Sequence, residues 1–320
     1  MFYDINSAIV AASKGDTIYI QGTQTNYCIP ATAKDSLTFI GSGFDPQKQN
    51  AYPTVVACGT WALGEYNVVI GMRIQGLAQN RPAGMANLTI KRCYLYNSGV
   101  GLLTLFTYQS VDNVIFEDCI FKDLSLFSNC NGCSTSNGGS YIGSAVVRNC
   151  LFYDSRLLAN ISVTVSNMLV DHCVFYNNSP ASIFAGVPTS SQIDMTNTIF
   201  INADPVIASG TGVTYTYNFS DSQNLNSVNS GSNNLQGAIT QFVNSPGGTF
   251  NFTHNYHLLA GSPCIGSGTS GSDMGIYGGL TPMRWDGSAG VPRIDFFNIL
   301  GTQVAPNGNL NIQFKSTTHD

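Results

Sequence analysis

The chain has 320 residues, a hydrophobic fraction of 43% and a formal net charge of −5. Only 10% of its residues are charged, and its 13 Lys and Arg residues are too few for the basic stripe of a nucleic-acid surface. No apolar run approaches the ~20 residues that span a bilayer. We therefore expect a folded protein that has a substantial core, no nucleic-acid partner and no transmembrane segment.

The first predicted element is a helix that caps an open end of the fold. In "INSAIVAASKG", apolar residues recur at helical spacing at Ile5, Ala8, Ile9 and Ala12, and Gly15 marks the stop. The stretch "TIYI" then alternates as a strand does. "SLTFIGSG" and "NVVIGMRIQG" continue the strand pattern, with Met72 in the position that cysteine takes later.

The centre of the chain repeats one pattern five times. The segments "LTIKRCYLYN", "VIFEDCIFKD", "AVVRNCLFYD", "MLVDHCVFYN" and "IDMTNTIFIN" align on an anchor position, which is Cys93, Cys119, Cys150, Cys173 and Thr198 in turn. The anchors are 26, 31, 23 and 25 residues apart. Apolar residues precede the anchor by five and three places and follow it by two, and Asn or Asp follows it by four. Short strands, a bend before the anchor and an Asx corner after it indicate one coil of a parallel β-helix.

The anchor cysteines are predicted to face inward and to stack from coil to coil. Side chains on adjacent parallel coils point the same way, which is poor disulfide geometry, and buried free cysteine packs as a small apolar residue. Thr198 fills the same position without thiol chemistry. The pattern therefore favours packing over a metal site or a disulfide ladder.

This repeat resembles those of the right-handed parallel β-helix, or pectin-lyase-like, superfamily. The opening "INSAIVAASKGDTIYIQGTQTNY" is similar to that group's first segment. The stretches "SNNLQGAITQFVN" and "YHLLAGSPCIGSGTSGSDMGIYGG" resemble the closing segment of secreted bacterial β-helix proteins, including those labelled choice-of-anchor. The resemblance implies an all-β solenoid of about ten coils over residues 1–290, with an N-terminal cap over about residues 1–20.

The tail predicts two further strands. "RIDFFNIL" and "NLNIQFKS" flank a turn at "APNGN", and Leu310, Ile312 and Phe314 alternate with polar residues. Residues 291–320 are predicted either to cap the end of the solenoid or to begin a further module.

Charged residues gather at the bend before the anchor. We expect them to stack into one ridge that contains Glu117, Asp118, Arg148, Asp171 and His172, preceded by Lys91 and Arg92. The resemblance implies that such a ridge can be catalytic, because β-helix lyases use carboxylates, often with Ca²⁺, and an Arg or Lys base. Hydrolases of the same fold place paired carboxylates as acid and base. The alternative is a solvated ladder of alternating sign that keeps the coils soluble and in register.

Two columns beside the ridge are rich in tyrosine, at Tyr94, Tyr96, Tyr153 and Tyr176. An exposed row of these rings could stack on sugars, since each offers a flat face and a polar tip. Alternatively, another segment covers them, such as the long polar stretch over residues 216–234.

Cys130 and Cys133 form a C-x-x-C pair in a Gly/Ser-rich stretch, with no second pair that would complete a zinc site. This setting favours a local disulfide or two exposed thiols over redox chemistry. No metal site is predicted, and Ca²⁺ enters only with the lyase hypothesis.

Two functions of different class follow. The first is an exported or cell-surface protein that binds a polysaccharide or another surface partner without catalysis. The second is a polysaccharide lyase or glycoside hydrolase that works from the ridge. The binding protein is favoured, because basic residues are scarce for gripping a polyanion. We interpret the lack of a signal peptide after Met1 as removal of a leader, so the expected location is extracellular, cell-surface or periplasmic.

Overall fold

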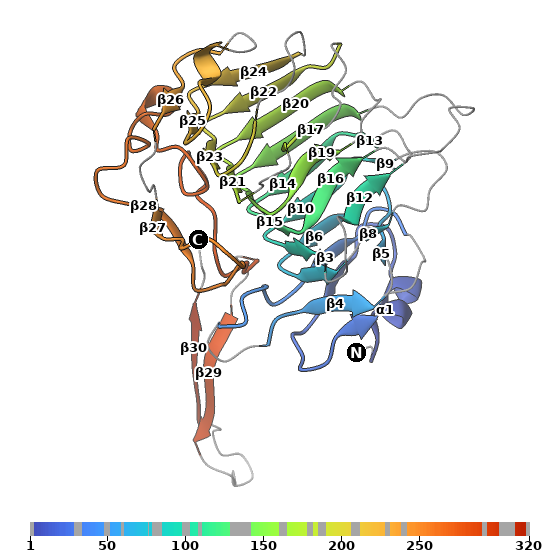
Figure 1. The fold of residues 1–320 in the computed structure, drawn as a ribbon. Coiled ribbons are helices and arrows are strands. Elements are labelled where there is room, and N and C mark those ends of the chain that lie inside the picture. The colour runs from blue at the N-terminus through green and yellow to red at the C-terminus, as the bar shows by residue number, and fades with distance from the viewer. Residues whose placement is uncertain are drawn as a thin grey trace, which may run out of the picture.

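The computed structural model describes residues 3–28, 34–47, 52–58, 61–75, 77–78, 85–97, 103–107, 111–128, 142–159, 165–177, 182–184, 190–205, 212–227, 231–237, 242–289, 293–300 and 311–317. The chain winds as a parallel β-helix, which confirms the predicted fold class (Figure 1). Successive coils contribute one strand to each of two long sheets, here called sheet A and sheet B. None of the helices in the described ranges is long and apolar enough to cross a membrane.

Both long sheets are parallel throughout their main paths. Sheet A runs in the order β1 (Thr17–Tyr19), β3 (Thr38–Ile40), β6 (Val68–Ile70), β10 (Thr89–Lys91), β14 (Val114–Glu117), β17 (Ile142–Arg148), β20 (Val165–Asp171), β22 (Ile193–Thr196) and β24 (Val213–Thr216), with β9 (Met85–Ala86) and β13 (Val111–Asp112) joined to β17. Sheet B runs in the order β2 (Tyr27–Cys28), β4 (Val55–Cys58), β7 (Arg73–Gln75), β11 (Tyr94–Tyr96), β15 (Ile120–Lys122), β18 (Leu151–Tyr153), β21 (Val174–Tyr176), β23 (Ile199–Ile201), β25 (Phe219–Ser220) and β26 (Leu235–Gln236).

Smaller elements complete the described chain. They are the helix α1 (Ile5–Ala11), the 3₁₀ turns η2 (Leu225–Ser227) and η3 (Thr269–Gly271), a third parallel sheet of β12 (Leu103–Thr107), β16 (Leu124–Ser128) and β19 (Arg156–Ala159), and the pairs β5 (Trp61–Ala62) with β8 (Leu77–Ala78), β27 (Phe242–Asn244) with β28 (Asn255–Leu258), and β29 (Arg293–Leu300) with β30 (Asn311–Thr317).

Each repeat turns at two corners where the backbone is left-handed. The predicted bend before the anchor is confirmed by positive φ at Arg92, Asp118, Asn149, His172 and Asn197. The predicted Asx corner is confirmed by positive φ at Asp123, Asp154, Asn177 and Asn202, whereas Asn97, the first of that column, does not adopt it. Asn and Asp recur here because their short polar side chains tolerate this conformation better than other residues with a Cβ.

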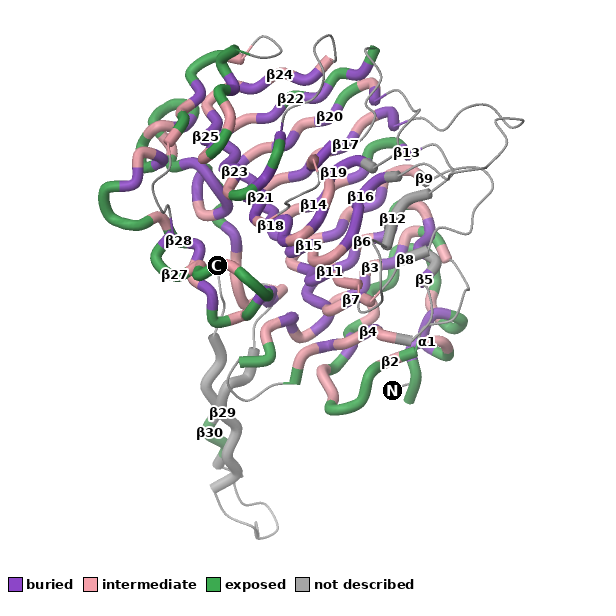
Figure 2. Tube along the Cα trace, viewed as in Figure 1, coloured by how far each residue is buried: buried purple, intermediate pink, exposed green. Residues whose placement is uncertain are grey.

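The predicted inward columns form the core. The anchor cysteines are fully buried and free, and the phenylalanines two places on stack face to face, with ring centroids 4.5 Å apart for Phe121–Phe152 and 4.4 Å for Phe152–Phe175. Figure 2 shows the resulting alternation of buried and less buried positions along the strands. In-register stacking of like residues therefore builds the interior, as the repeat predicts.

The end of the core near β24 is closed by amides. Asn218 and Asn234 occupy the anchor position of two further coils and are buried. The Asn218 side chain accepts from the backbone N–H of Thr198 at 2.8 Å and donates to the carbonyl of Met195 at 2.8 Å. These coils lie in the polar stretch over residues 216–234, where Asn at the inward position hides the repeat in the sequence.

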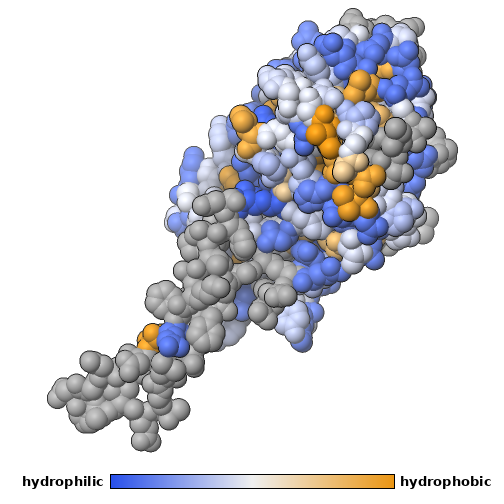
Figure 3. Space-filling model, turned by 90° about the vertical axis from the view of Figure 1, so that its left-hand side faces the viewer, coloured by the Kyte–Doolittle hydropathy of each residue, from blue (hydrophilic) through white to orange (hydrophobic). Residues whose placement is uncertain are grey.

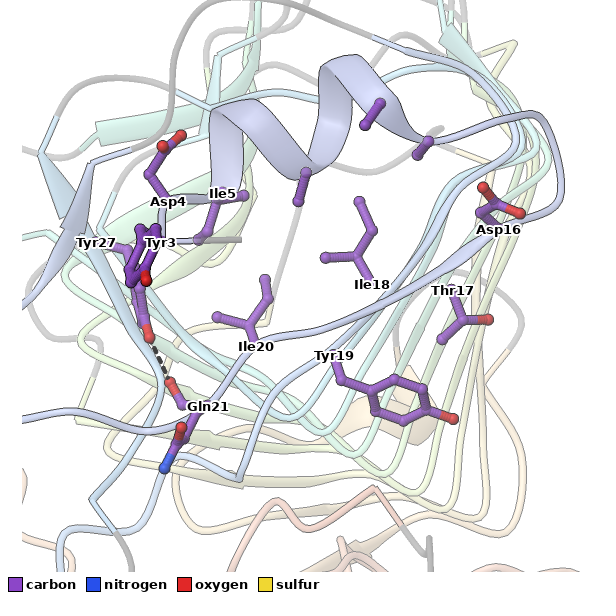
Figure 4. A pocket seen from close by; sticks show the side chains of 13 residues that line it. Tyr3, Asp4, Ile5, Asp16, Thr17, Ile18, Tyr19, Ile20, Gln21 and Tyr27 are labelled. Atoms are coloured by element: carbon purple, nitrogen blue, oxygen red, sulfur yellow. Dashed lines mark hydrogen bonds between the residues drawn. The ribbon is translucent and has the colours of Figure 1, made fainter. Parts of the chain in front are cut away.

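The other end is closed by α1, as predicted. Asp4 caps the helix by accepting from the N–H of Ser7, and Ile5, Ala8 and Ile9 are buried. Ile18 and Ile20 of the first coil point toward the helix across a cavity of about 480 Å³ (Figure 4). The seven-residue helix thus leaves a cavity between itself and the first coil.

The predicted C-terminal strand pair is present as an antiparallel ribbon of β29 and β30. It projects away from the solenoid (Figure 1), and its strands pair only with each other among the described residues.

Substituting Phe152→Ala should lower the free energy of unfolding by about 3–5 kcal/mol, because it removes the centre of the phenylalanine stack and leaves a cavity. Urea denaturation followed by circular dichroism measures this. The control Tyr19→Ala, at a position that is 69% exposed, should change stability by no more than about 0.5 kcal/mol. Equal effects of the two substitutions would contradict the stacked core.

Denatured, non-reduced protein should titrate at least five free thiols, from Cys93, Cys119, Cys150, Cys173 and Cys264. In the native protein these thiols should react slowly with a thiol reagent. Burial raises the pKa of Cys93 and Cys150 well above its ordinary value, so little thiolate forms. Fewer than five thiols after denaturation would contradict the free cysteines, and fewer than four would show that the inward column is oxidised.

Candidate functional site

The predicted ridge exists as two adjacent columns. Lys91, Glu117, Arg148 and Asp171 lie side by side on the outer face of sheet A, each opposite the next in strand register. Arg92, Asp118, Asn149, His172 and Asn197 follow them at the left-handed corner. We call the first set the outer column and the second set the corner column.

The outer column is a ladder of ion pairs. The Nζ of Lys91 lies 2.6 Å from Oε2 of Glu117, and the Nε of Arg148 lies 3.9 Å from Oδ2 of Asp171. The basic side chains are 38% and 40% exposed, and the acidic ones 15% and 19%. Pairs of this exposure stabilise a protein little, but they place opposite charges on adjacent coils and so oppose slippage.

The corner column is buried except at Arg92, whose side chain is 22% exposed. Asp118 is 3% exposed and lies 3.4 Å from the Nε of Arg92 through its Oδ2. His172 is 7% exposed; its Nδ1 lies 2.8 Å from Oδ1 of Asp171, and its Nε2 lies 3.3 Å from Oγ of Ser272. These two side chains therefore have no open path to a polymeric substrate in this structure.

A closing segment, residues 242–289, covers the corner column. The side-chain amide of Asn149 donates to the carbonyls of Ile276 and Gly278, each at 3.0 Å. Gly278 fits closely, since a Cβ there would lie 1.9 Å from the carbonyl oxygen of Asp273 and 2.6 Å from Cδ2 of His172. The segment thus depends on close backbone approach to the ridge.

The same contact continues along the solenoid on both sides of His172. The N–H of Thr269 donates to Oδ1 of Asn197 at 2.7 Å, and the guanidinium of Arg92 donates to the carbonyl of Ser288 at 3.1 Å. The corner column is therefore a docking track for the chain's own C-terminal part.

The predicted tyrosine row also lies beneath the closing segment. Tyr94, Tyr153 and Tyr176 are buried, and Tyr96 is half-buried and stacked on Tyr94. The hydroxyl of Tyr153 donates to the carbonyl of Gly248 and that of Tyr176 to the carbonyl of Ser245, both at 2.6 Å. The exposed row does not form; coverage by another segment, the stated alternative, is what the structure shows.

The covering segment is not the polar stretch over residues 216–234, which instead forms the last coils. A second apolar cluster joins sheet B to the closing segment and contains Phe44, Tyr94, Ile120, Leu151, Tyr153, Val174, Tyr176, Ile199, Phe219, Phe242, Phe250, Tyr256, Cys264, Met274, Ile276 and Met283. Figure 3 shows that the exterior on this side is largely hydrophilic, with separate apolar groups. Most of the apolar side chains of the closing segment therefore pack against the solenoid.

Burial sets the protonation of the ridge carboxyls. Desolvation raises the pKa of Asp118 to about 6, although the nearby Arg92 lowers it, and Oδ1 of Asp118 has no hydrogen-bond partner in the described part of the chain. Burial also disfavours ionisation of Asp171, but hydrogen bonds from His172, Asn197 and Thr196 outweigh it and lower the pKa of Asp171. The two carboxyls therefore differ in proton affinity because of local packing.

Asn149 and Asn197 are absent from the predicted site because they carry no charge. Their position directly before the anchor, shared with Arg92, Asp118 and His172, was the available signal.

No group of three His, Cys, Asp or Glu side chains that could hold a metal ion occurs in the ranges that the structure describes. Each ridge carboxylate already has a cationic partner, so the ridge does not fit a Ca²⁺ site. Cys130 and Cys133 lie outside the described residues.

No protein-family model and no curated protein sequence matches this chain. The fold is therefore established by the strand pairing, and the site by its own geometry.

Stability should respond to the titration of Asp118. Its raised pKa means that the folded state binds the proton more tightly than the unfolded state. Stability therefore falls as the pH rises from the ordinary pKa of 3.8 to the folded-state pKa of about 6, and the full cost of ionisation remains above that. Between about pH 7 and pH 5 the wild type should gain about 1 kcal/mol relative to Asp118→Asn, which does not titrate. Urea denaturation at several pH values measures the difference, and parallel profiles would contradict the buried carboxyl.

Proposed function

We propose that this chain is an exported or cell-surface β-helix protein that binds a polysaccharide or another surface partner and has no catalytic role. The observation that carries the proposal is the closing segment, which lies over Asp118 and His172. A general acid or base must come within hydrogen-bond reach of the reacting atoms, and these side chains are sequestered by the protein itself. This supports a structural role for the corner column.

An elongated binding surface remains. The outer face of sheet A extends over nine successive strands, from β1 to β24. A flat face of this kind suits an extended partner, which can contact successive coils in the same way. Since Lys91 and Arg148 are each neutralised by an adjacent carboxylate and the whole chain carries −5, a neutral polysaccharide fits better than a polyanion.

Two features support export. Cys28 is disulfide-bonded, and its register partner on the next coil is Cys58. Disulfides persist mainly in oxidising compartments. The resemblance to the pectin-lyase-like superfamily, and to closing segments of secreted bacterial proteins, points the same way.

The alternative, a polysaccharide lyase or glycoside hydrolase, is favoured by one observation. Arg148 has the most exposed side chain of the paired ridge residues and lies beside Asp171. A cation next to carboxylates is the arrangement that could neutralise and deprotonate a uronate.

Both functions are tested by incubating the purified chain with neutral and acidic polysaccharides, with and without Ca²⁺. Retention in affinity electrophoresis reports binding, and new reducing ends or unsaturated uronate absorbance report cleavage. We expect retention by a neutral polysaccharide and no product. Failure of every polysaccharide to retard the chain would contradict a glycan partner.

Cleavage would contradict the non-catalytic proposal. Its assignment to the ridge then requires that Arg148→Ala abolishes product while Lys14→Ala, at an exposed cation away from the ridge, leaves it unchanged.

A further inference from the structure

The outer face of sheet A has partly exposed aliphatic side chains. Val68, Ile70, Ile115, Val146 and Leu169 are each intermediate in exposure. None of them belongs to either apolar cluster of the described residues. They are neither in the core nor beneath the closing segment, so their apolar surface is available to a partner.

Two adjacent columns define this face over six strands, from β6 to β22. The aliphatic column is Val68, Thr89, Ile115, Val146, Leu169 and Asp194, and the outer column continues in both directions as Ile70, Lys91, Glu117, Arg148, Asp171 and Thr196. The signs in the outer column run plus, minus, plus, minus from β10 to β20. Read in the opposite direction, they run minus, plus, minus, plus.

When the order of the charges in the outer column is reversed, every position changes sign. The column is therefore complementary to a reversed copy of itself. When two such faces meet with antiparallel solenoid axes, each column can lie over its own copy, read backwards. For a twofold axis parallel to the strands and between β14 and β17, Lys91 faces the partner's Asp171, and Glu117 faces the partner's Arg148. All four charges of each copy then meet an opposite charge.

The aliphatic column fits the same arrangement. At the centre Ile115 faces the partner's Val146, and on either side Thr89 faces the partner's Leu169. Asp194 falls at the rim opposite the partner's Val68, where its exposed carboxylate stays in water. The interface therefore has an apolar centre beside a charged stripe and a polar edge, which is the usual composition of protein interfaces.

The charges also exclude the neighbouring registers. If the axis moved onto β14, Glu117 would face its own copy and Lys91 would face the partner's Arg148. If it moved onto β17, Arg148 would face its own copy and Glu117 would face the partner's Asp171. A slip of one strand in either direction therefore brings three of the four charges of each copy opposite a like charge and leaves the fourth opposite an uncharged residue.

We propose that the outer face of sheet A is the interface of a homodimer in which two copies pack antiparallel about an axis between β14 and β17. This goes beyond the proposed function and does not depend on a glycan. The dimer would cover the face on which a polysaccharide is proposed to bind, so a second copy and a polysaccharide would compete for it. The dimer assay contains no polysaccharide, so either proposal can fail without the other.

The first test is sedimentation of the whole 34.2 kDa chain at several protein concentrations. We expect a species of twice the monomer mass at low ionic strength, with weaker association as salt screens the charged stripe. A monomer at every concentration in low salt overturns the proposal.

The register is tested by the exchange Lys91→Glu with Glu117→Lys. This variant keeps the composition, the net charge and an ion pair between β10 and β14. However, the new carboxylate at position 91 faces the partner's Asp171, and the new ammonium at position 117 faces the partner's Arg148. We expect dissociation to be favoured at least about tenfold, with an unchanged circular dichroism spectrum. The melting temperature should fall slightly, because the new ammonium at position 117 also lies beside Arg148 of its own copy. The control Arg148→Lys keeps every sign and should dimerise.

Chemical cross-linking tests the same register without changing any charge. Copies carrying Thr89→Cys are mixed with copies carrying Leu169→Cys and treated with a short bismaleimide, since facing sheets pack ~10 Å apart. Either position is displaced from its own copy by three further strand spacings of ~4.8 Å. The mixture should cross-link, and either variant alone should do so much less. Equal cross-linking of each variant alone, or dimerisation of the exchange variant as strong as that of the wild type, overturns the proposed register.

Discussion

In-register stacking of equivalent residues on successive parallel coils is the constraint on which this structure depends. Each inward side chain lies against the equivalent inward side chains of the adjacent coils, so phenylalanine stacks on phenylalanine and cysteine packs on cysteine in the repeat. The left-handed corners make this possible, because Asn, Asp and a few other residues turn the chain at the same point in every coil. The outer column obeys the same rule, and there the repulsion of like charges requires the sign to alternate.

The closing segment determines what the exterior can do. By docking on the corner column and on the tyrosines of sheet B, it covers the tyrosine row and the corner part of the ridge, while the outer column stays partly exposed. The residue types of a lyase ridge and of a sugar-stacking row are present, yet their polar atoms bond to the chain itself. Candidate chemistry on a solenoid therefore depends on which faces remain open as much as on which residues line them.

The fold could be predicted because the repeat determines the strand register. Aligning the five segments on their anchors, from Cys93 to Thr198, gives the strand pairs that the structure contains. The alignment did not include Asn218 and Asn234 as anchors. A buried amide that bonds to neighbouring backbone cannot be distinguished in the sequence from a loop residue. The ion pairs of the ridge followed from adjacency of the coils. The burial of the corner column could not be predicted, because the contact of Asn149 with Ile276 joins residues 127 positions apart that share no sequence pattern.

The direction in which the closing segment runs has a mechanical consequence. Gly275 bonds to Asn197, Ile276 to Asn149, and Ser288 to Arg92, so the segment travels back from the late coils toward the early ones. The N–H of Phe44, in one of the first coils, bonds to Asp286 at 3.3 Å. Because the segment ends beside the coils where the chain begins, tension between the two ends of the chain would load the bonds of Asp286 and Ser288 before that of Ile276. Because the closing segment joins late coils to early ones, the coils would separate only after it had detached.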